Sequence, residues 1–276
     1  MKRVLTGAVL IIAVLALIYF DIPWLLTAVS ACLALLAALE FRDLTAKAGW
    51  PIPLWWTVVA IAALFAISAA GWVEPLAAVS VLTLLLFTMN AFRSALERVL
   101  PETGAGLLML LYVAFPLTLV PRILGAEDGT ALLLFLFLCV WCGDIAALYV
   151  GKNLGRRKLA PSLSPNKTWE GSIASVAGSV LFGMGLIWLG DWFSGHNSAF
   201  TRLHTSWPWW QFALLAVLLN VSAQVGDLAE SALKRGVGVK DSGTLLPGHG
   251  GMLDRIDALL FAAPVLWFVL VLRAAL

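Results

Sequence analysis

The sequence ALLLFLFLCVWCGDIAALYV, residues 131–150, is apolar throughout except for one acid, Asp144. A helix that crosses a bilayer needs about 20 predominantly apolar residues, and its backbone polar groups must be satisfied within the helix. This stretch has that length and therefore predicts a transmembrane helix. An ionisable residue inside such a helix is costly, so Asp144 is a candidate substrate-binding residue.

Apolar stretches of this kind recur along the whole chain, which has 276 residues, 61% of them hydrophobic and 12% charged. Soluble domains carry about 25% charged residues, so the composition excludes an ordinary soluble protein. No segment alternates apolar and polar residues between turn signals, which argues against a β-barrel. The predicted fold is an all-α, polytopic membrane helical bundle with about nine transmembrane helices in one membrane-embedded domain, residues 1–276. The expected helices are 4–20, 22–39, 54–70, 75–90, 104–124, 131–150, 171–190, 207–225 and 257–272.

Lysine and arginine are unevenly distributed between the predicted loops. If the N-terminus is cytoplasmic, alternate loops place all but three of the 18 basic residues on the cytoplasmic side. The positive-inside rule requires such a bias. We therefore expect a cytoplasmic N-terminus, a C-terminus on the opposite side, and two long cytoplasmic loops at 151–170 and 226–256. We also expect the first apolar run to be retained as a span, because no small-residue cleavage site follows it.

The most polar stretch is Ser231–Asp257, SALKRGVGVKDSGTLLPGHGGMLDRID. It mixes both signs of charge with repeated glycines, and membrane proteins rarely keep such a cluster without a use for it. Glycines let backbone N–H groups approach a phosphate, and lysine and arginine bind phosphate oxygens. The stretch therefore predicts a site for phosphates and a divalent cation. Lys234 and Arg235 are candidate catalytic residues, and the candidate substrate-binding residues are Ser231, Lys240, Asp241, His249, Gly250, Gly251 and Arg255.

Three aspartates in and beside this stretch are candidate catalytic and metal-binding residues. Asp227 begins a run that, if helical, places its carboxylate on the same face as Lys234. Asp254 and Asp257 lie three residues apart at the start of the last predicted helix. Magnesium takes one or two carboxylates together with waters and substrate phosphate oxygens, so we expect Mg²⁺ here, with room for a second metal ion. The alternative is that these acids only neutralise nearby basic residues in structural salt bridges.

The other polar loop contains Ser164–Gly171, SPNKTWEG. Proline favours a turn there, and a lysine and a glutamate lie next to the predicted start of a helix. Basic residues earlier in the loop follow the positive-inside rule or bind anionic lipid headgroups. Ser164, Asn166, Lys167 and Glu170 are therefore further candidate substrate-binding residues.

Both polar stretches resemble motifs of the phosphatidate cytidylyltransferases, the CDP-diacylglycerol synthases. The first motif has a serine, Lys-Arg, Lys-Asp, His-Gly-Gly and Asp-Arg-x-Asp, and the second is SPxKTWEG. All of these are matched, by Ser231, Lys234-Arg235, Lys240-Asp241, His249-Gly250-Gly251, Asp254-Arg255-Ile256-Asp257 and Ser164–Gly171. The first 140 residues or so resemble the family only in hydrophobic character.

The resemblance implies an enzyme that converts CTP and phosphatidic acid into CDP-diacylglycerol and pyrophosphate, with Mg²⁺, at the cytoplasmic face of a bacterial inner membrane. Residues 1–130 would form five N-terminal spans, and residues 131–276 would form the catalytic part. The partners are then the two substrates and the lipid bilayer, and no nucleic acid is expected. A stripe of small residues at Ser175, Ser179 and Gly183 allows close helix packing, either within the protomer or in a homodimer.

Two other functions are compatible with parts of the pattern. A polyprenol kinase of related build would transfer the γ-phosphate of CTP and release CDP. A transporter for anionic solutes would also carry charges in a membrane protein, although here they concentrate at one membrane face and no inverted repeat is evident. A CDP-alcohol phosphotransferase is disfavoured because its DGxxAR…GxxxD motif is absent.

Overall fold

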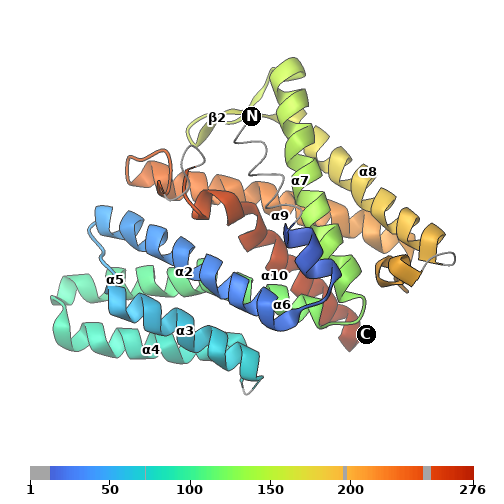
Figure 1. Cartoon of the computed structure of the whole chain (residues 1–276). Helices are drawn as coiled ribbons and strands as arrows, with labels where there is room; N and C mark the ends of the chain where they lie inside the picture. The colour runs from blue at the N-terminus through green and yellow to red at the C-terminus, as the bar shows by residue number, and fades with distance from the viewer. Residues whose placement is uncertain (1–12, 72, 195–197, 245–249) are drawn as a thin grey trace.

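The structure is a computed structural model that describes residues 13–71, 73–194, 198–244 and 250–276. Its described part is a bundle of helices with one small two-stranded sheet (Figure 1). Seven described helices are long and apolar enough to cross a membrane, which confirms the predicted all-α membrane fold and makes this a multi-pass membrane protein. Most of the first predicted helix, 4–20, lies outside the described residues, although residues 13–19 are helical.

The N-terminal part contains α2 (Pro23–Lys47), α3 (Leu54–Ala70), α4 (Pro75–Arg93), α5 (Leu96–Leu108) and α6 (Phe115–Leu124). A π-helical segment, η1 (Met109–Ala114), joins α5 to α6, so these three form one span of 29 residues. In this wider turn the N–H of Phe115 donates to the carbonyl of Leu110, five residues back. Pro116, which follows, has no N–H for the usual bond four residues back, so the wider turn accommodates it.

This span begins eight residues before its predicted start at residue 104. Sequence reasoning placed the charged residues before 104 in a loop. In the structure two of them pair: Glu102 forms an ion pair with Arg98, at 2.9 Å between Oε1 and Nε, and Glu102 also accepts a hydrogen bond from Ser94 Oγ at 2.6 Å. The charges are therefore satisfied along the helix surface and do not end the helix.

The C-terminal part contains four long helices: α7 (Gly129–Leu154), α8 (Trp169–Ser194), α9 (Trp209–Gly236) and α10 (Leu253–Ala275). A short 3₁₀ helix, η2 (Ser198–Leu203), follows α8. The most extensive packing is between α7 and α8 and between α9 and α10, and Figure 1 shows each pair side by side. Helix α2 contacts η1, α6 and α10, so it joins the N-terminal helices to the last helix.

The small-residue stripe of α8 packs within the protomer. Ser179 is buried and donates to the carbonyl of Cys139 on α7 at 2.5 Å. Asn220 of α9 is also buried and donates to Ser175 and Ser179, at 2.9 and 2.7 Å. Interhelical hydrogen bonds of this kind contribute to helix association inside a membrane. The stripe therefore holds α7, α8 and α9 together, and the homodimer stays a prediction.

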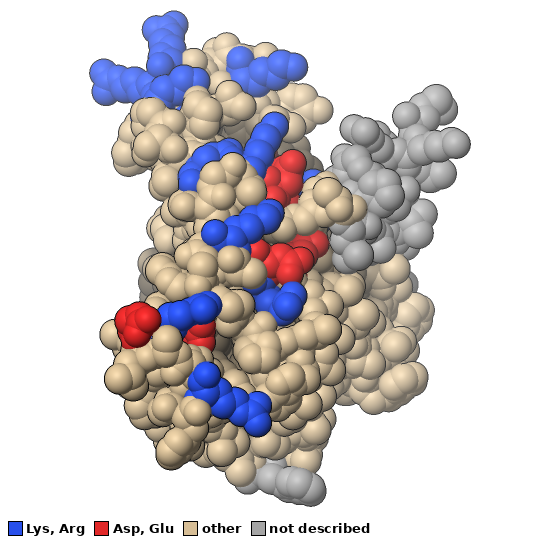
Figure 2. Space-filling view, turned by 90° about the vertical axis from the view of Figure 1, so that its left-hand side faces the viewer, with Lys and Arg blue, Asp and Glu red and all other residues tan. Residues whose placement is uncertain are grey.

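The basic loops lie together at one end of the molecule. Arg98 donates to the carbonyl of Gly49 after α2, and the β-hairpin that follows α7 contacts α9 through Lys167 and Asp227. Figure 2 looks onto the left-hand side of Figure 1 and shows many Lys and Arg side chains on this face, with acidic residues near its centre. The other three arginines lie outside the basic loops. Arg122 forms an ion pair with Glu74, and Arg202 pairs with Asp21 and donates to the carbonyl of Tyr19. Arg273 donates to the side chain of Gln211.

Both predicted loops contain regular secondary structure within their predicted bounds. In the loop 151–170, β1 (Lys158–Ala160) and β2 (Ser164–Thr168) form an antiparallel hairpin. In the loop 226–256, helix α9 continues to Gly236 and α10 begins at Leu253. The connecting loop is thus only 237–252, and residues 245–249 in it are outside the described part.

Candidate active site

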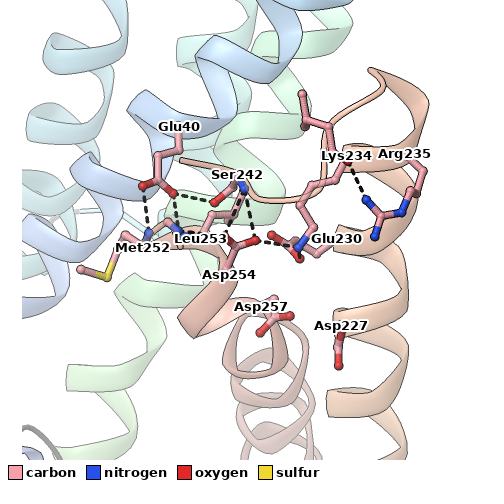
Figure 3. A network of polar contacts seen from close by, with 12 residues as sticks. Glu40, Asp227, Glu230, Lys234, Arg235, Ser242, Met252, Leu253, Asp254 and Asp257 are labelled. Carbon is pink, nitrogen blue, oxygen red and sulfur yellow. Dashed lines mark hydrogen bonds and ion pairs between the residues drawn. The ribbon is translucent and has the colours of Figure 1, made fainter. Parts of the chain in front are cut away.

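The site lies where the last turns of α9 meet the first turn of α10. Because α9 is helical through Gly236, the predicted shared face exists: Asp227, Glu230 and Lys234 lie on successive turns of one helix. Figure 3 shows Lys234 and Glu230 beside Asp254 at the start of α10, with Asp257 and Asp227 below them. Two elements separated by the glycine-rich loop therefore form one charged cluster.

A buried ion-pair network forms the centre of this cluster. The ammonium group of Lys234 is 2.6 Å from Oδ1 of Asp254 and also pairs with Glu230 one turn earlier. The side chains of Lys234 and Asp254 are about one-tenth exposed, and that of Glu230 is 1% exposed. Buried charges are tolerated only when paired, so the three side chains depend on one another. Glu230 was not among the predicted site residues, although its position on the same face of α9 was visible in the sequence.

Asp254 binds both Lys234 and the glycine-rich loop. Its carboxylate accepts the N–H of Gly251 at 2.8 Å and the N–H of Ser242 at 3.1 and 3.3 Å from its two oxygens. With Lys234, these contacts use most of the lone-pair positions of a carboxylate. Gly250 has φ +77°, and a Cβ there would lie 2.8 Å from Oδ2 of Asp254. In this structure Gly250 and Gly251 therefore shape the backbone around Asp254.

A second group of carboxylates lies beside this network. Asp227 forms an ion pair with Lys167 of β2, at 2.5 Å between Oδ2 and Nζ. Asp144 lies on α7 and Asp257 on α10, and both of these helices pack against α9, which carries Asp227. Asp257 accepts the N–H of Ala258 at 2.8 Å, and no ion pair involves it among the described residues. Asp144 is exposed despite its position in an apolar helix.

These carboxylates have the oxygen donors that magnesium prefers. The described residues contain no group of three His, Cys, Asp or Glu side chains close enough to hold a metal ion by themselves. Of the three predicted metal ligands, Asp254 is engaged by Lys234 and two backbone N–H groups, Asp227 pairs with Lys167, and Asp257 accepts one backbone N–H.

The β-hairpin carries the remaining candidate residues from the second motif. Ser164 and Lys167 are half-buried on β2, and Asn166 is exposed. The carboxylate of Glu170, in the first turn of α8, accepts the backbone N–H groups of Arg156 and Arg157 at distances of 3.1 to 3.3 Å. Glu170 therefore fixes the base of the hairpin, and Lys167 is the residue of this motif that reaches the charged cluster.

The other predicted residues surround the cluster. Ser231 is buried on α9, and Arg235 donates to the carbonyl of Val239 at 2.7 Å, at the end of that helix. Lys240, Asp241 and Arg255 are exposed. His249 lies outside the described residues.

Sequence reasoning missed Glu40 of α2. Its side chain is buried and accepts the N–H groups of Met252 and Leu253 at 2.8 and 2.9 Å and the hydroxyl of Ser242 at 2.8 Å (Figure 3). The available signal was an acid at the end of an apolar run, directly after the predicted end of the second helix at 39. That helix instead continues to Lys47, which places Glu40 inside the bundle.

Comparison with known proteins identifies the family of this chain. A family model described as "Cytidylyltransferase family" matches residues 1–273, so the chain belongs to this family. It is 43% identical over 146 residues to the phosphatidate cytidylyltransferase of Synechocystis sp., covering 52% of this chain and 44% of that protein. It is 43% identical over 159 residues to the protein of the same name from Brucella suis, covering 57% and 54%, and 39% identical over 145 residues to that of Staphylococcus epidermidis, covering 52% and 51%. The matches thus span about half the length of these relatives.

Proposed function

We propose that this protein is a phosphatidate cytidylyltransferase, which joins CTP and phosphatidic acid to give CDP-diacylglycerol and pyrophosphate. Membership of the cytidylyltransferase family and the names of the relatives support this reaction class. The observation that carries the proposal is the contact between Lys167 and Asp227. It joins the motif Ser164–Gly171 to helix α9, which carries the start of the second motif, so that both motifs contribute to one charged site at the basic end of the molecule.

The chemistry requires positioning and charge neutralisation more than proton transfer. A phosphate monoester has its second pKa at about 6, so the phosphate of phosphatidic acid is largely ionised near neutral pH. One of its oxygens attacks the α-phosphorus of CTP, a P–O bond forms, and the bond to the β-phosphate breaks to release pyrophosphate. Enzymes accelerate such transfers mainly by alignment and by electrostatic stabilisation.

Four basic residues would share the binding of the substrate phosphates. Lys167 lies at the surface of the cluster and can exchange Asp227 for a substrate phosphate, because both are only partly buried. Lys234 is held by two carboxylates and would present its remaining N–H to a phosphate oxygen. Arg235 and Lys240, at the mouth of the loop, would contact the more distant phosphates.

A magnesium ion fits the donor set, and Asp227 and Asp257 would hold it, with Asp144 nearby. Bound there, it would neutralise charge on the nucleotide phosphates. Asp254, the third predicted ligand, would hold Lys234 and the loop, and would join the metal only if it gave up one of these contacts.

The basic end of the molecule would face the cytoplasm, in a bacterial inner membrane. The positive-inside rule supports this orientation, since the loops with most of the lysines and arginines cluster at that end. CTP would reach the site from the cytoplasm, and phosphatidic acid would enter laterally from the inner leaflet.

Purified protein in nanodiscs tests the proposal, with phosphatidic acid, magnesium and CTP labelled at the α- or γ-phosphate. We expect the α-label in the lipid and pyrophosphate in solution. Transfer of the γ-label with release of CDP would instead identify a lipid kinase that uses the same site. Absence of transfer of either label would overturn the enzymatic proposal for these substrates.

A further inference from the structure

We propose that Glu40 is a positioning residue that holds the glycine-rich loop and the start of α10 in the geometry of the active site. It belongs to α2, in the N-terminal part of the chain, and lies more than 200 residues from its partners in the sequence. This inference rests on the proposed function only where activity is measured.

The contacts of Glu40 are those of a helix cap supplied by another helix. The first N–H groups of any helix have no partner within it, and a carboxylate at this end also interacts favourably with the helix dipole. The residue at the N-cap of α10 makes no side-chain capping bond of its own. Glu40 supplies the missing acceptors: its two oxygens accept the N–H groups of Met252 and Leu253.

The same carboxylate also binds the loop. Its Oε2 accepts the hydroxyl of Ser242 at 2.8 Å, and the N–H of Ser242 in turn donates to Asp254. Glu40 and Asp254 therefore bind the same residue, Glu40 through the hydroxyl and Asp254 through the backbone N–H (Figure 3). This arrangement connects Glu40, through one residue, to the carboxylate that pairs with Lys234.

The glycines of the loop fit tightly around this carboxylate. A Cβ at Gly243 would lie 2.5 Å from Oε1 of Glu40, and its three nearest atoms would all belong to Glu40. A Cβ at Gly251 would overlap both Ser242 Oγ and Glu40 Oε2. Close packing against Glu40 thus accounts for the absence of side chains at both positions. Gly243 has no left-handed φ, so space is the only structural demand that the described residues place on it.

Glu40 is buried without an ion pair to lysine or arginine among the described residues. A charge in such a place must be satisfied by hydrogen bonds, and three donors satisfy this one. A glutamine would offer one carbonyl oxygen in place of two carboxylate oxygens, so at least one of the three donors would lose its partner. The loop and the first turn of α10 would then be held less tightly, and Asp254 and Asp257 would shift with them.

A proteolysis experiment tests this role of Glu40 without substrates. Trypsin is added to the folded full-length protein in detergent, and cleavage after Lys240, in the loop, is followed by mass spectrometry. We expect Glu40→Gln and Glu40→Ala to raise the cleavage rate at least fivefold, and Ser242→Ala to raise it less. Glu102→Gln is the matched control, because Glu102 is equally buried but its side chain, within the described part of the chain, binds Arg98 and Ser94 and no part of the loop. A cleavage rate in the Glu40 variants no higher than in Glu102→Gln would overturn the proposal.

A double-mutant cycle tests the geometry through activity. We expect Gly243→Ala to lower kcat at least tenfold in the wild-type background but less than twofold further in the Glu40→Ala background, because the obstructing carboxylate is gone. Gly236→Ala, which meets open space, should have the same small effect in both backgrounds. In Glu40→Ala we expect kcat to change by a larger factor than KM. Glu40→Asp should retain part of the activity. Equal losses from Gly243→Ala in both backgrounds would contradict the proposal. If the wild type transfers no label, the proposed function fails, and trypsin still decides the role of Glu40.

Discussion

Replacing Lys234 by methionine should destabilise the protein strongly, because it leaves two carboxylates together without a cation. The side chain of Glu230 is 1% exposed and that of Asp254 is 10% exposed. Asp254 would keep its three backbone hydrogen-bond contacts, but Glu230 has no hydrogen-bond donor apart from Lys234 among the described residues. Removing one partner of a buried ion pair costs about 3–5 kcal/mol.

This cost translates into a large change in melting temperature. In chains of 150–250 residues, 1 kcal/mol shifts Tm by about 2–4 °C, so Lys234→Met should lower Tm by about 6–20 °C. Thermal unfolding of purified protein in one detergent, followed by intrinsic fluorescence, measures the shift. Lys240→Met is the control, since Lys240 is an exposed lysine of the adjoining loop.

The double variant separates charge from shape. Adding Glu230→Gln to Lys234→Met removes the stranded carboxylate, so we expect it to recover at least a third of the lost Tm. The reasoning is refuted if Lys234→Met shifts Tm no more than Lys240→Met does, or if Glu230→Gln lowers the Tm of the Lys234→Met protein further.

Three further predictions follow from the site and its support. Asp227→Ala and Asp257→Ala should each lower the rate of α-label transfer at least 100-fold while changing Tm by less than about 4 °C, because these acids are not part of the Lys234 network; a near-normal rate in either variant would remove that residue from the active site. Gly250→Ala should lower both Tm and kcat, since φ +77° is unfavourable for alanine and its Cβ would approach Asp254; unchanged values would show that the loop has room to relax. Asn220→Leu should destabilise the packing of α7, α8 and α9 by about 1–2 kcal/mol, the scale of hydrogen bonds between membrane helices. Unfolding measurements check this value, with Asn166→Leu, at an exposed position, as the control.

Much of the fold could be predicted from local sequence. The length of apolar runs is sufficient to identify spanning helices, because inside a bilayer the backbone N–H and C=O groups have few other ways to form hydrogen bonds. The predictions erred at helix ends. Glu102 was placed before the helix expected at 104–124, and Glu230 was placed in the loop 226–256, whereas both lie within helices of the structure. In the structure a partner one turn away neutralises each of these charges, and such pairing cannot be distinguished from exposure by hydropathy alone.

The candidate site could be located from sequence but its internal contacts could not. Asp227 and Lys234 were predicted to share a helix face, and the helix extends far enough to place them there. The pairing of Lys167 with Asp227 and of Lys234 with Asp254 depends on how three separate elements pack. Asp254 was expected to bind metal, and its role in holding Lys234 and two backbone N–H groups became visible only when those groups were placed around it.

The amino-acid sequence by itself determined that this is a multi-pass helical membrane protein with two polar motifs, because apolar length and charge bias are properties of single segments. The tertiary structure decided which charges meet. Glu40 illustrates the difference: in sequence it is one of two acids near the end of a largely apolar helix, with no signal that links it to Ser242 or Leu253. Its partners are backbone N–H groups and a hydroxyl that reach it only after α2 has packed against α10. A buried carboxylate must find such donors, and only the folded chain shows which ones they are.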